Sequence, residues 1–148
     1  MRIREITASD LDRCSHLFAG VFSGPPWHEP WTIESALHRL SHFFQSPGFV
    51  GLLAEDTATI AFVLGNTEPF QSGEWFYLRE MCTSTAHQRQ GIGRTLLRNL
   101  DEKLGSMGIR HIYLLTDRHI PAAQFYLANG YQASDRMGCY FRDIPPLP

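Results

Sequence analysis

The chain has 148 residues, of which 43% are apolar and 19% are charged. This length fits one domain, and the composition excludes a disordered or fibrous protein. Thirteen basic residues against fifteen acidic ones give a net charge of −2. Nucleic-acid binders normally carry an excess of basic residues. A membrane-spanning helix needs about 20 mostly apolar residues in a row, and no segment of the chain is that long and that apolar. We therefore expect neither nucleic acid nor a membrane as a partner.

The N-terminus and the cysteines indicate the compartment. The first residues lack the apolar stretch of a secretory signal peptide. Three cysteines, Cys14, Cys82 and Cys139, are odd in number and widely spaced. Because disulfides are rare in reducing compartments, this usage favours a cytoplasmic protein. No linker or internal repeat divides the chain, so residues 1–148 are expected to form a single domain.

Hydrophobic periodicity predicts alternating strands and helices. From the N-terminus these are a strand at 3–6, a helix with apolar positions Leu11 to Val21, a Pro-rich loop at 23–30 and a helix with apolar positions Ile33 to Phe44. There follow strands at 49–54, 60–64 and 74–82, a long helix at 91–107, a strand at 111–116, a short helix at 121–128 and a strand pair within 131–141. This order predicts an α/β (α+β mixed) domain with helices packed on a mixed sheet.

Residues 80–94 join a strand to the strongest helix through a basic turn that contains glycines. Gly91 and Gly93 let the backbone approach a ligand closely, and the first N–H groups of the helix have no partner within it. Such a helix start suits a phosphate, to which Arg89 and Arg94 would add charge-assisted contacts. The structural alternative is an ordinary tight turn.

Two motifs connect this turn with a known family. The segment Gln88 to Arg94 contains the pattern [QR]xxGxG and resembles the acetyl-CoA pyrophosphate loop of the GNAT superfamily of N-acetyltransferases. The segment Pro121 to Tyr131 resembles the family signature A-x-x-[FL]-Y-x-x-x-G-[FY]. The resemblance implies a mostly antiparallel central sheet of about six or seven strands, splayed in the middle and flanked by about four helices. One departure is that His119 and Ile120 stand where members usually carry a cofactor-binding asparagine.

The resemblance also implies an activity. Members transfer the acetyl group of acetyl-CoA directly to a primary amine through a tetrahedral intermediate, with acetyl-CoA as co-substrate and no metal. The sheet would splay near Met81 to Thr83, where the backbone would pair with the pantetheine arm and polarise the thioester carbonyl. The cofactor-binding residues carried over by position are Met81, Cys82, Thr83, Gln88, Arg89, Gln90, Gly91, Ile92, Gly93 and Arg94.

Two residues match positions that move protons in the family. Tyr126 matches the general acid that protonates the departing CoA thiolate, a role that suits a phenol because its ordinary pKa is about 10. Glu80 stands just before the splay, where members place a base or a water-mediated proton acceptor. Apolar neighbours would raise the pKa of such a carboxyl. An ion pair with Arg79 or another basic group is an equal alternative for Glu80.

The Pro-rich loop lies where the family covers its acceptor pocket, and it contains Trp27, Glu29 and Trp31. Aromatic walls and a carboxylate suit a small cationic amine, such as a polyamine, an amino acid or an aminoglycoside-like amine. Tryptophans that only cap the core are the competing interpretation. Other acceptors remain open, namely a protein N-terminus or lysine, as does a non-catalytic acyl-CoA-binding regulatory module. Members often dimerise, although no segment here marks a homodimer interface.

Two further patterns are candidates for a metal site and for a catalytic nucleophile. Glu34, His38 and His42 recur every four residues on one helix face. No further ligand cluster accompanies them, so a solvated or substrate-facing stripe is favoured over a zinc site. Cys82 would lie near the thioester, but no histidine is placed by sequence to activate it, which favours a small core residue over an acyl-cysteine.

Overall fold

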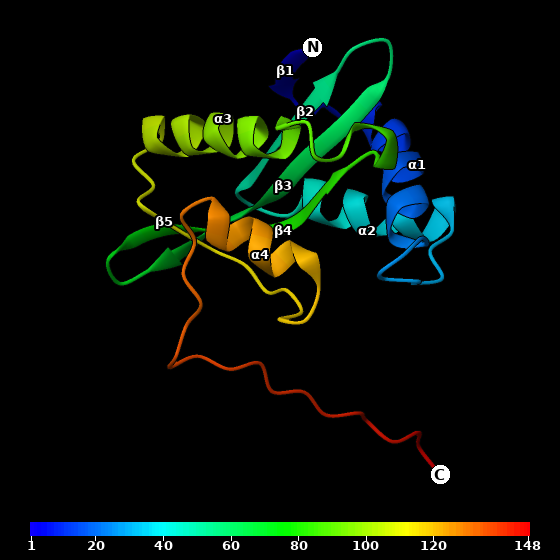
Figure 1. Cartoon of the computed structure of the whole chain (residues 1–148). Coiled ribbons are helices and arrows are strands. Elements are labelled where there is room, and N and C mark those ends of the chain that lie inside the picture. Colours follow the sequence, from blue (N-terminus) through cyan, green and yellow to red (C-terminus); the bar gives the residue numbers. More distant parts are fainter. The chain divides into compact units, whose positions relative to one another are not determined.

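The computed structural model describes residues 1–148, whose contacts divide the chain into two units, Met1–Leu114 and Leu115–Pro148. The first unit is built on a five-stranded sheet in the order β1-β2-β3-β4-β5 (Figure 1). The strands are β1 (Arg2–Glu5), β2 (Phe49–Glu55), β3 (Thr59–Phe70), β4 (Gly73–Thr83) and β5 (His111–Tyr113). Strands β1 to β4 pair with one another in antiparallel fashion and β5 is parallel to β4, which confirms the expected mixed, mostly antiparallel sheet.

Three helices cover the sheet of the first unit: α1 (Leu11–Phe22), α2 (Ile33–Gln45) and α3 (Ile92–Ser106). Apolar residues of α1 and α2 form one buried cluster with Leu53, Phe62 and Cys82, which lie side by side on one face of β2, β3 and β4. The opposite face is covered by α3, which contacts the same three strands through its apolar stripe. The buried residues of that stripe are Ile92, Leu96, Leu97, Leu100 and Leu104.

Local sequence explains where α2 begins. Thr32 is extended and caps the helix by accepting the Ser35 N–H at 3.0 Å, while the Ser35 hydroxyl accepts the Thr32 N–H at 3.0 Å. Ser35 therefore serves at the position where a capping box usually has glutamate or glutamine. This reciprocal cap fixes the first turn of α2, so that Leu40 and Phe43 face the core.

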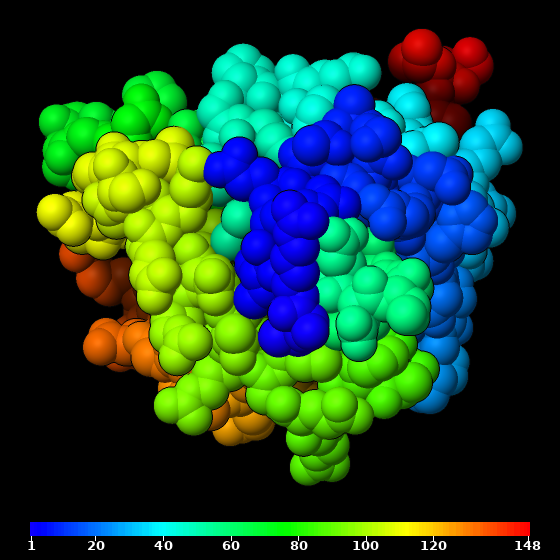
Figure 2. All heavy atoms as spheres, turned by 90° about the horizontal axis from the view of Figure 1, so that it is seen from above, coloured from blue at the N-terminus to red at the C-terminus, as the bar shows by residue number.

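A buried ion-pair network fastens the N-terminal segment to the sheet. Asp10 is 1% exposed and accepts two hydrogen bonds from the Arg4 guanidinium, both at 2.8 Å. It also accepts the Thr7 N–H at 2.8 Å and a bond from Arg13, while Arg4 bonds Glu55 of β2. Nearby, Lys103 of α3 pairs with Glu5 of β1, and Figure 2 shows these two elements side by side, in yellow-green and dark blue.

The sheet opens between β4 and β5, as the expected splay requires. Only Trp75 to Tyr77 of β4 pair with β5, so the β4 edge from Leu78 to Thr83 has no strand beside it. On the other side of β4 a bulge interrupts the pairing with β3, because Leu64 pairs with Glu80 and Gly65 with Leu78. Arg79 is thus the extra residue of β4, and the strand bends at this point.

The predicted strand count of about six or seven is wrong, because the sheet has five strands. The expected strand pair within 131–141 does not form, and β5 ends at Tyr113 rather than at residue 116. The Ser134 hydroxyl accepts the N–H groups of Arg136 at 3.3 Å and Met137 at 2.9 Å, which commits these donors to a local turn. The second unit instead contains α4 (Pro121–Ala128), as the sequence predicts. No helix in the structure has the length and apolar character needed to cross a membrane.

Candidate active site

The N-terminus of α3 offers unpaired N–H groups. Gly91 precedes the helix with φ 79°, in the left-handed region, and a Cβ added there would meet no atom within 4 Å. The first helical bond runs from the Thr95 N–H to the Gly91 carbonyl at 3.0 Å, and no side chain caps this end. The N–H groups of Ile92, Gly93 and Arg94 therefore have no acceptor within the helix, which suits an anion.

Side-chain amides hold the loop that leads into α3. Gln88 donates to the Thr83 carbonyl at 3.0 Å, which ties the loop to the end of β4, and Gln90 donates to the Ala86 carbonyl at 3.2 Å. Arg89 and Arg94 are exposed and take part in none of the chain's ion pairs. Their guanidinium groups are therefore available to an anion at the helix start.

The end of β4 brings its backbone to the open edge of the sheet. Met81, Cys82 and Thr83 pair on one side with β3, and on the other side no strand covers them. The Cys82 side chain belongs to the core shared with α1 and α2. Burial raises the pKa of its thiol well above the ordinary value, so the thiolate that an acyl-cysteine would require is disfavoured.

Glu80 lies on this open edge, one residue before Met81, and has both an apolar environment and an ion pair. Its side chain is 13% exposed, and its Oε1 accepts the Nε–H of Arg39 from α2 at 2.6 Å. Burial raises the pKa of the Glu80 carboxyl, the Arg39 hydrogen bond and charge oppose this rise, and the nearby charge of Glu29 adds to it. The apolar environment expected for Glu80 is present, and so is an ion pair, with Arg39 rather than Arg79.

Aromatic rings surround the guanidinium of Arg39. Its central carbon lies 5.8 Å from the centre of the Trp31 ring and 4.9 Å from that of Phe43. Trp31 packs edge-on against Phe18, with ring centres 4.9 Å apart. Trp27 packs in the same way on α1, and both tryptophans rest on the core, whereas Glu29 is exposed. The loop that carries these residues therefore covers the core beside Glu80.

The second arginine at this place is Arg79, the bulge residue of β4. Its guanidinium carbon lies 3.9 Å from the centre of the Tyr77 ring and 5.3 Å from that of Phe43. Arg39 and Arg79 were missed as site residues by the sequence reasoning, which named Arg79 only as a partner for Glu80. Arg39 stands one helical turn before Phe43, so periodicity alone places the two on one face of α2.

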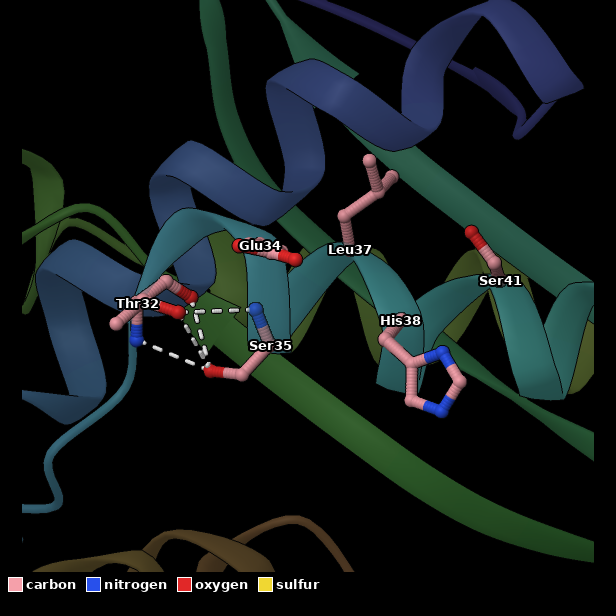
Figure 3. Close-up of a pocket in the computed structure, with 6 residues that line it drawn as sticks. All are labelled: Thr32, Glu34, Ser35, Leu37, His38 and Ser41. Carbon is pink, nitrogen blue, oxygen red and sulfur yellow. Dashed lines mark hydrogen bonds between the residues drawn. The ribbon is translucent and has the colours of Figure 1, made fainter.

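The exposed side of α2 forms a surface hollow, lined by Thr32, Glu34, Ser35, Leu37, His38 and Ser41 (Figure 3). Leu37 points toward α1, while Glu34 and His38 are exposed. Nowhere in the chain do three or more histidine, cysteine, aspartate or glutamate side chains come together as metal ligands would. Glu34, His38 and His42 therefore do not form such a group in the structure.

Tyr126 belongs to the second unit, where it stands on α4 and is half-buried. Its ring centre lies 5.3 Å from that of Phe125 and 5.2 Å from that of Tyr131. Its carbonyl accepts the Tyr131 N–H at 3.1 Å, which closes the end of α4. Glu80 and the start of α3 belong to the first unit, so the general-acid role of Tyr126 stays a prediction.

Most of the chain matches a known protein family. The model of the "Acetyltransferase (GNAT) family" matches residues 11–131. No curated protein sequence matches the chain. The match includes the end of β4, the start of α3 and the tyrosine of α4, and it extends across the boundary between the two units.

Solved structures share the fold at low sequence identity. A probable acetyltransferase superposes with a TM-score of 0.81 at 18% identity, covering 99% of this chain and 100% of that one. A second structure is an aminoglycoside acetyltransferase, meta-AAC0020 from an uncultured soil metagenomic sample, in complex with sisomicin. It superposes with a TM-score of 0.76 at 16% identity, covering 97% of this chain and 96% of that one. A third is AAC(6')-Iy in complex with the bisubstrate analog CoA-S-monomethyl-acetylneamine. It superposes with a TM-score of 0.73 at 15% identity, covering 97% of this chain and 98% of that one.

Proposed function

The chain belongs to the acetyltransferase (GNAT) family, and we propose that it transfers the acetyl group of acetyl-CoA to a primary amine of a small cationic molecule. The observation that carries this proposal is the arrangement at the end of β4. There a mostly buried carboxylate, Glu80, stands on an open strand edge, and the loop at 84–91 connects this edge to the unpaired N–H groups of α3. In this proposal Glu80 activates the amine, and the residues that follow it on β4 bind the thioester.

The start of α3 fits the pyrophosphate of acetyl-CoA. The N–H groups of Ile92, Gly93 and Arg94 bind its oxygens, and the open space at Gly91 admits the close approach. Arg89 and Arg94 add positive charge, while Gln88 and Gln90 hold the loop in shape. The backbone of Met81, Cys82 and Thr83 pairs with the amide groups of the pantetheine arm, as a further strand would pair with an open edge.

Glu80 acts as the base in this proposal. An amine attacks only in its neutral form, and a carboxyl whose pKa is raised by burial accepts the ammonium proton more readily than an ordinary one. Trp31, Trp27 and Glu29 line the acceptor side, where aromatic rings and a second carboxylate favour a cation. Tyr126 protonates the leaving thiolate.

The acceptor class is supported by two of the structural neighbours. One is an aminoglycoside acetyltransferase bound to sisomicin, and another carries a bisubstrate analog of CoA and acetylneamine. At 15–16% identity these neighbours share the fold, so the amine itself is argued from Glu80, Glu29 and Trp31. A direct transfer is favoured over a covalent acyl-enzyme, because Cys82 is buried and its pKa is raised.

The first test is calorimetric titration with acetyl-CoA of the wild type, Gly91→Glu and Gly108→Glu. Both glycines have φ 79° and open space at the Cβ, but they flank opposite ends of α3, which makes the second variant a matched control for backbone strain. We expect micromolar binding by the wild type and Gly108→Glu, and at least tenfold weaker binding by Gly91→Glu, whose carboxylate repels the pyrophosphate.

Turnover is then measured as release of the CoA thiol with a panel of polyamines, amino acids and aminoglycosides. Acetylation of a small amine supports the proposal. Absence of acetyl-CoA binding by the wild type would overturn it, as would equal loss of binding in both glycine variants. Binding without turnover, for small amines and for peptides with free N-termini or lysines, would instead favour a non-catalytic acyl-CoA-binding module.

A further inference from the structure

Arg79 is a half-buried arginine without an anionic partner. Three other arginines of the first unit, Arg4, Arg13 and Arg39, form ion pairs with carboxylates. Arg79 forms none, and its buried Nε has no hydrogen-bond partner. Arg2, Arg89, Arg94, Arg98 and Arg110 also lack ion pairs, but they are exposed, so water satisfies them. Only the Nε of Arg79 is withdrawn from water, and its terminal Nη groups are not buried. A polar group that is buried without a partner costs free energy, and the accessible Nη groups leave room for an anionic ligand to bind this guanidinium.

The surroundings hold the guanidinium in place without neutralising it. Tyr77 and Phe43 contact it with their rings at 3.9 and 5.3 Å, which partly compensates the lost hydration and restricts the side chain. Neither ring can accept the in-plane N–H donors of the fork. Those donors match a carboxylate, which accepts two parallel hydrogen bonds from one guanidinium.

Arg79 stands beside the base of the proposed reaction. The bulge places Arg79 and Glu80 against the same helix, since Arg79 contacts Phe43 and Glu80 bonds Arg39, both of α2. Glu80 uses Oε1 for Arg39, and no protein donor contacts its Oε2. A free carboxylate oxygen and a free guanidinium therefore lie at adjacent residues of one strand.

We propose that this pair recognises a primary amine that also carries a carboxylate, with the ammonium at Glu80 Oε2 and the carboxylate at Arg79. The inference rests on the proposed function. Of the polyamines, amino acids and aminoglycosides considered there, it favours amino acids and similar molecules that carry a carboxylate beside the ammonium group. A polyamine or aminoglycoside would bring further ammonium groups next to Arg79, where like charges repel. Arg79 therefore favours amino acids over polyamines and aminoglycosides, whereas Glu80, Glu29 and Trp31 alone would bind the ammonium group of any of them.

The test compares matched acceptors that differ only in the carboxylate: three amino acids, one aromatic, one aliphatic and one basic, each against its decarboxylated amine and its amide. kcat/KM is measured with saturating acetyl-CoA for the wild type, Arg79→Gln, Arg79→Lys and Arg2→Gln. Arg2 is an exposed arginine of β1 without an ion pair, so its variant controls for loss of one positive charge. Thermal melting establishes that every variant is folded.

The wild type is expected to prefer at least one amino acid over its amine and amide by about 10- to 100-fold, the range of a charge-assisted pair. Arg79→Gln should abolish that preference by lowering kcat/KM for the amino acid. Arg79→Lys should retain part of the preference, and Arg2→Gln should leave it unchanged. Acetylation of amines without any carboxylate preference, or a preference that survives in Arg79→Gln, would overturn this inference alone. Absence of acetylation by a chain that binds acetyl-CoA would overturn the proposed function and this inference with it.

Discussion

Truncation of Asp10 to alanine is expected to destabilise the protein strongly. The carboxylate is 1% exposed and accepts bonds from Arg4, Arg13 and Thr7, which together fasten β1 and the start of α1 to β2. Removing one partner of a buried ion pair costs about 3–5 kcal/mol, since the other charge is left uncompensated. Arg4 keeps Glu55 as a partner, so the low end of this range, about 3 kcal/mol, is expected.

The assay is urea unfolding followed by circular dichroism, with Asp12→Ala as the matched control. Asp12 lies two positions after Asp10, in the first turn of α1, but its side chain is 69% exposed and its ion pair with His16 is long, at 3.6 Å. Its replacement should change the free energy of unfolding by less than about 0.5 kcal/mol. A loss of about 3 kcal/mol in Asp10→Ala would lower Tm by roughly 6–12 °C for a chain of this size.

The destabilisation caused by Asp10→Ala is also expected to depend on pH. Hydrogen bonds from Arg4 hold the pKa of Asp10 well below its usual range in the folded protein. The unfolded chain binds this proton more readily, so the contribution of Asp10 is complete above the unfolded pKa of about 3.9 and is lost as the pH falls below it. The stability gap between wild type and Asp10→Ala should therefore narrow below about pH 4. A gap under 0.5 kcal/mol at pH 7, or one that stays constant down to pH 3, would refute the reasoning.

Two further predictions concern the proposed chemistry. Tyr126→Phe should lower kcat by about 10- to 10³-fold with little change in acetyl-CoA affinity, and an unchanged kcat would remove Tyr126 from the mechanism. Glu80→Gln should abolish the acidic limb of the pH profile of kcat/KM. Arg39→Gln should move that limb to higher pH, because Arg39 lowers the pKa of Glu80 against the opposing effects of burial and Glu29. A limb that stays in place in both variants would show that another group titrates.

The parts of the fold that sequence predicts well are those fixed by neighbouring residues. The Thr32 cap, the apolar stripe of α3 and the proline at the start of α4 each act within a few positions, and each helix forms where expected. The strand pair beyond Tyr131 was predicted from apolar and aromatic residues alone. A strand also needs backbone donors for a neighbour, and Ser134 takes two of these locally.

The candidate site likewise has one part that neighbouring residues determine and one part that depends on contacts distant in the sequence. The start of α3 was predicted because its requirements are local: a glycine in the left-handed region followed by unpaired N–H groups. Arg39 was missed because its partner Glu80 is 41 positions away in the sequence, a distance at which periodicity carries no information. Both residues are ordinary in type, and only the packing of α2 on β4 brings them together.

Arg79 shows why the alternation of a strand can mislead at a functional position. In a regular strand, neighbours such as Arg79 and Glu80 point to opposite faces, so a carboxylate and a guanidinium in sequence would serve different surfaces. The bulge removes this constraint, since Leu64 pairs with Glu80 and Gly65 with Leu78, and Gly65 has no side chain where a Cβ would lie 2.0 Å from the Tyr77 carbonyl oxygen. Both charged residues then reach α2. Gly65 directly follows the apolar run at 60–64 and pairs with Leu78, the residue before Arg79, and a glycine at such a place in a strand often indicates a bulge.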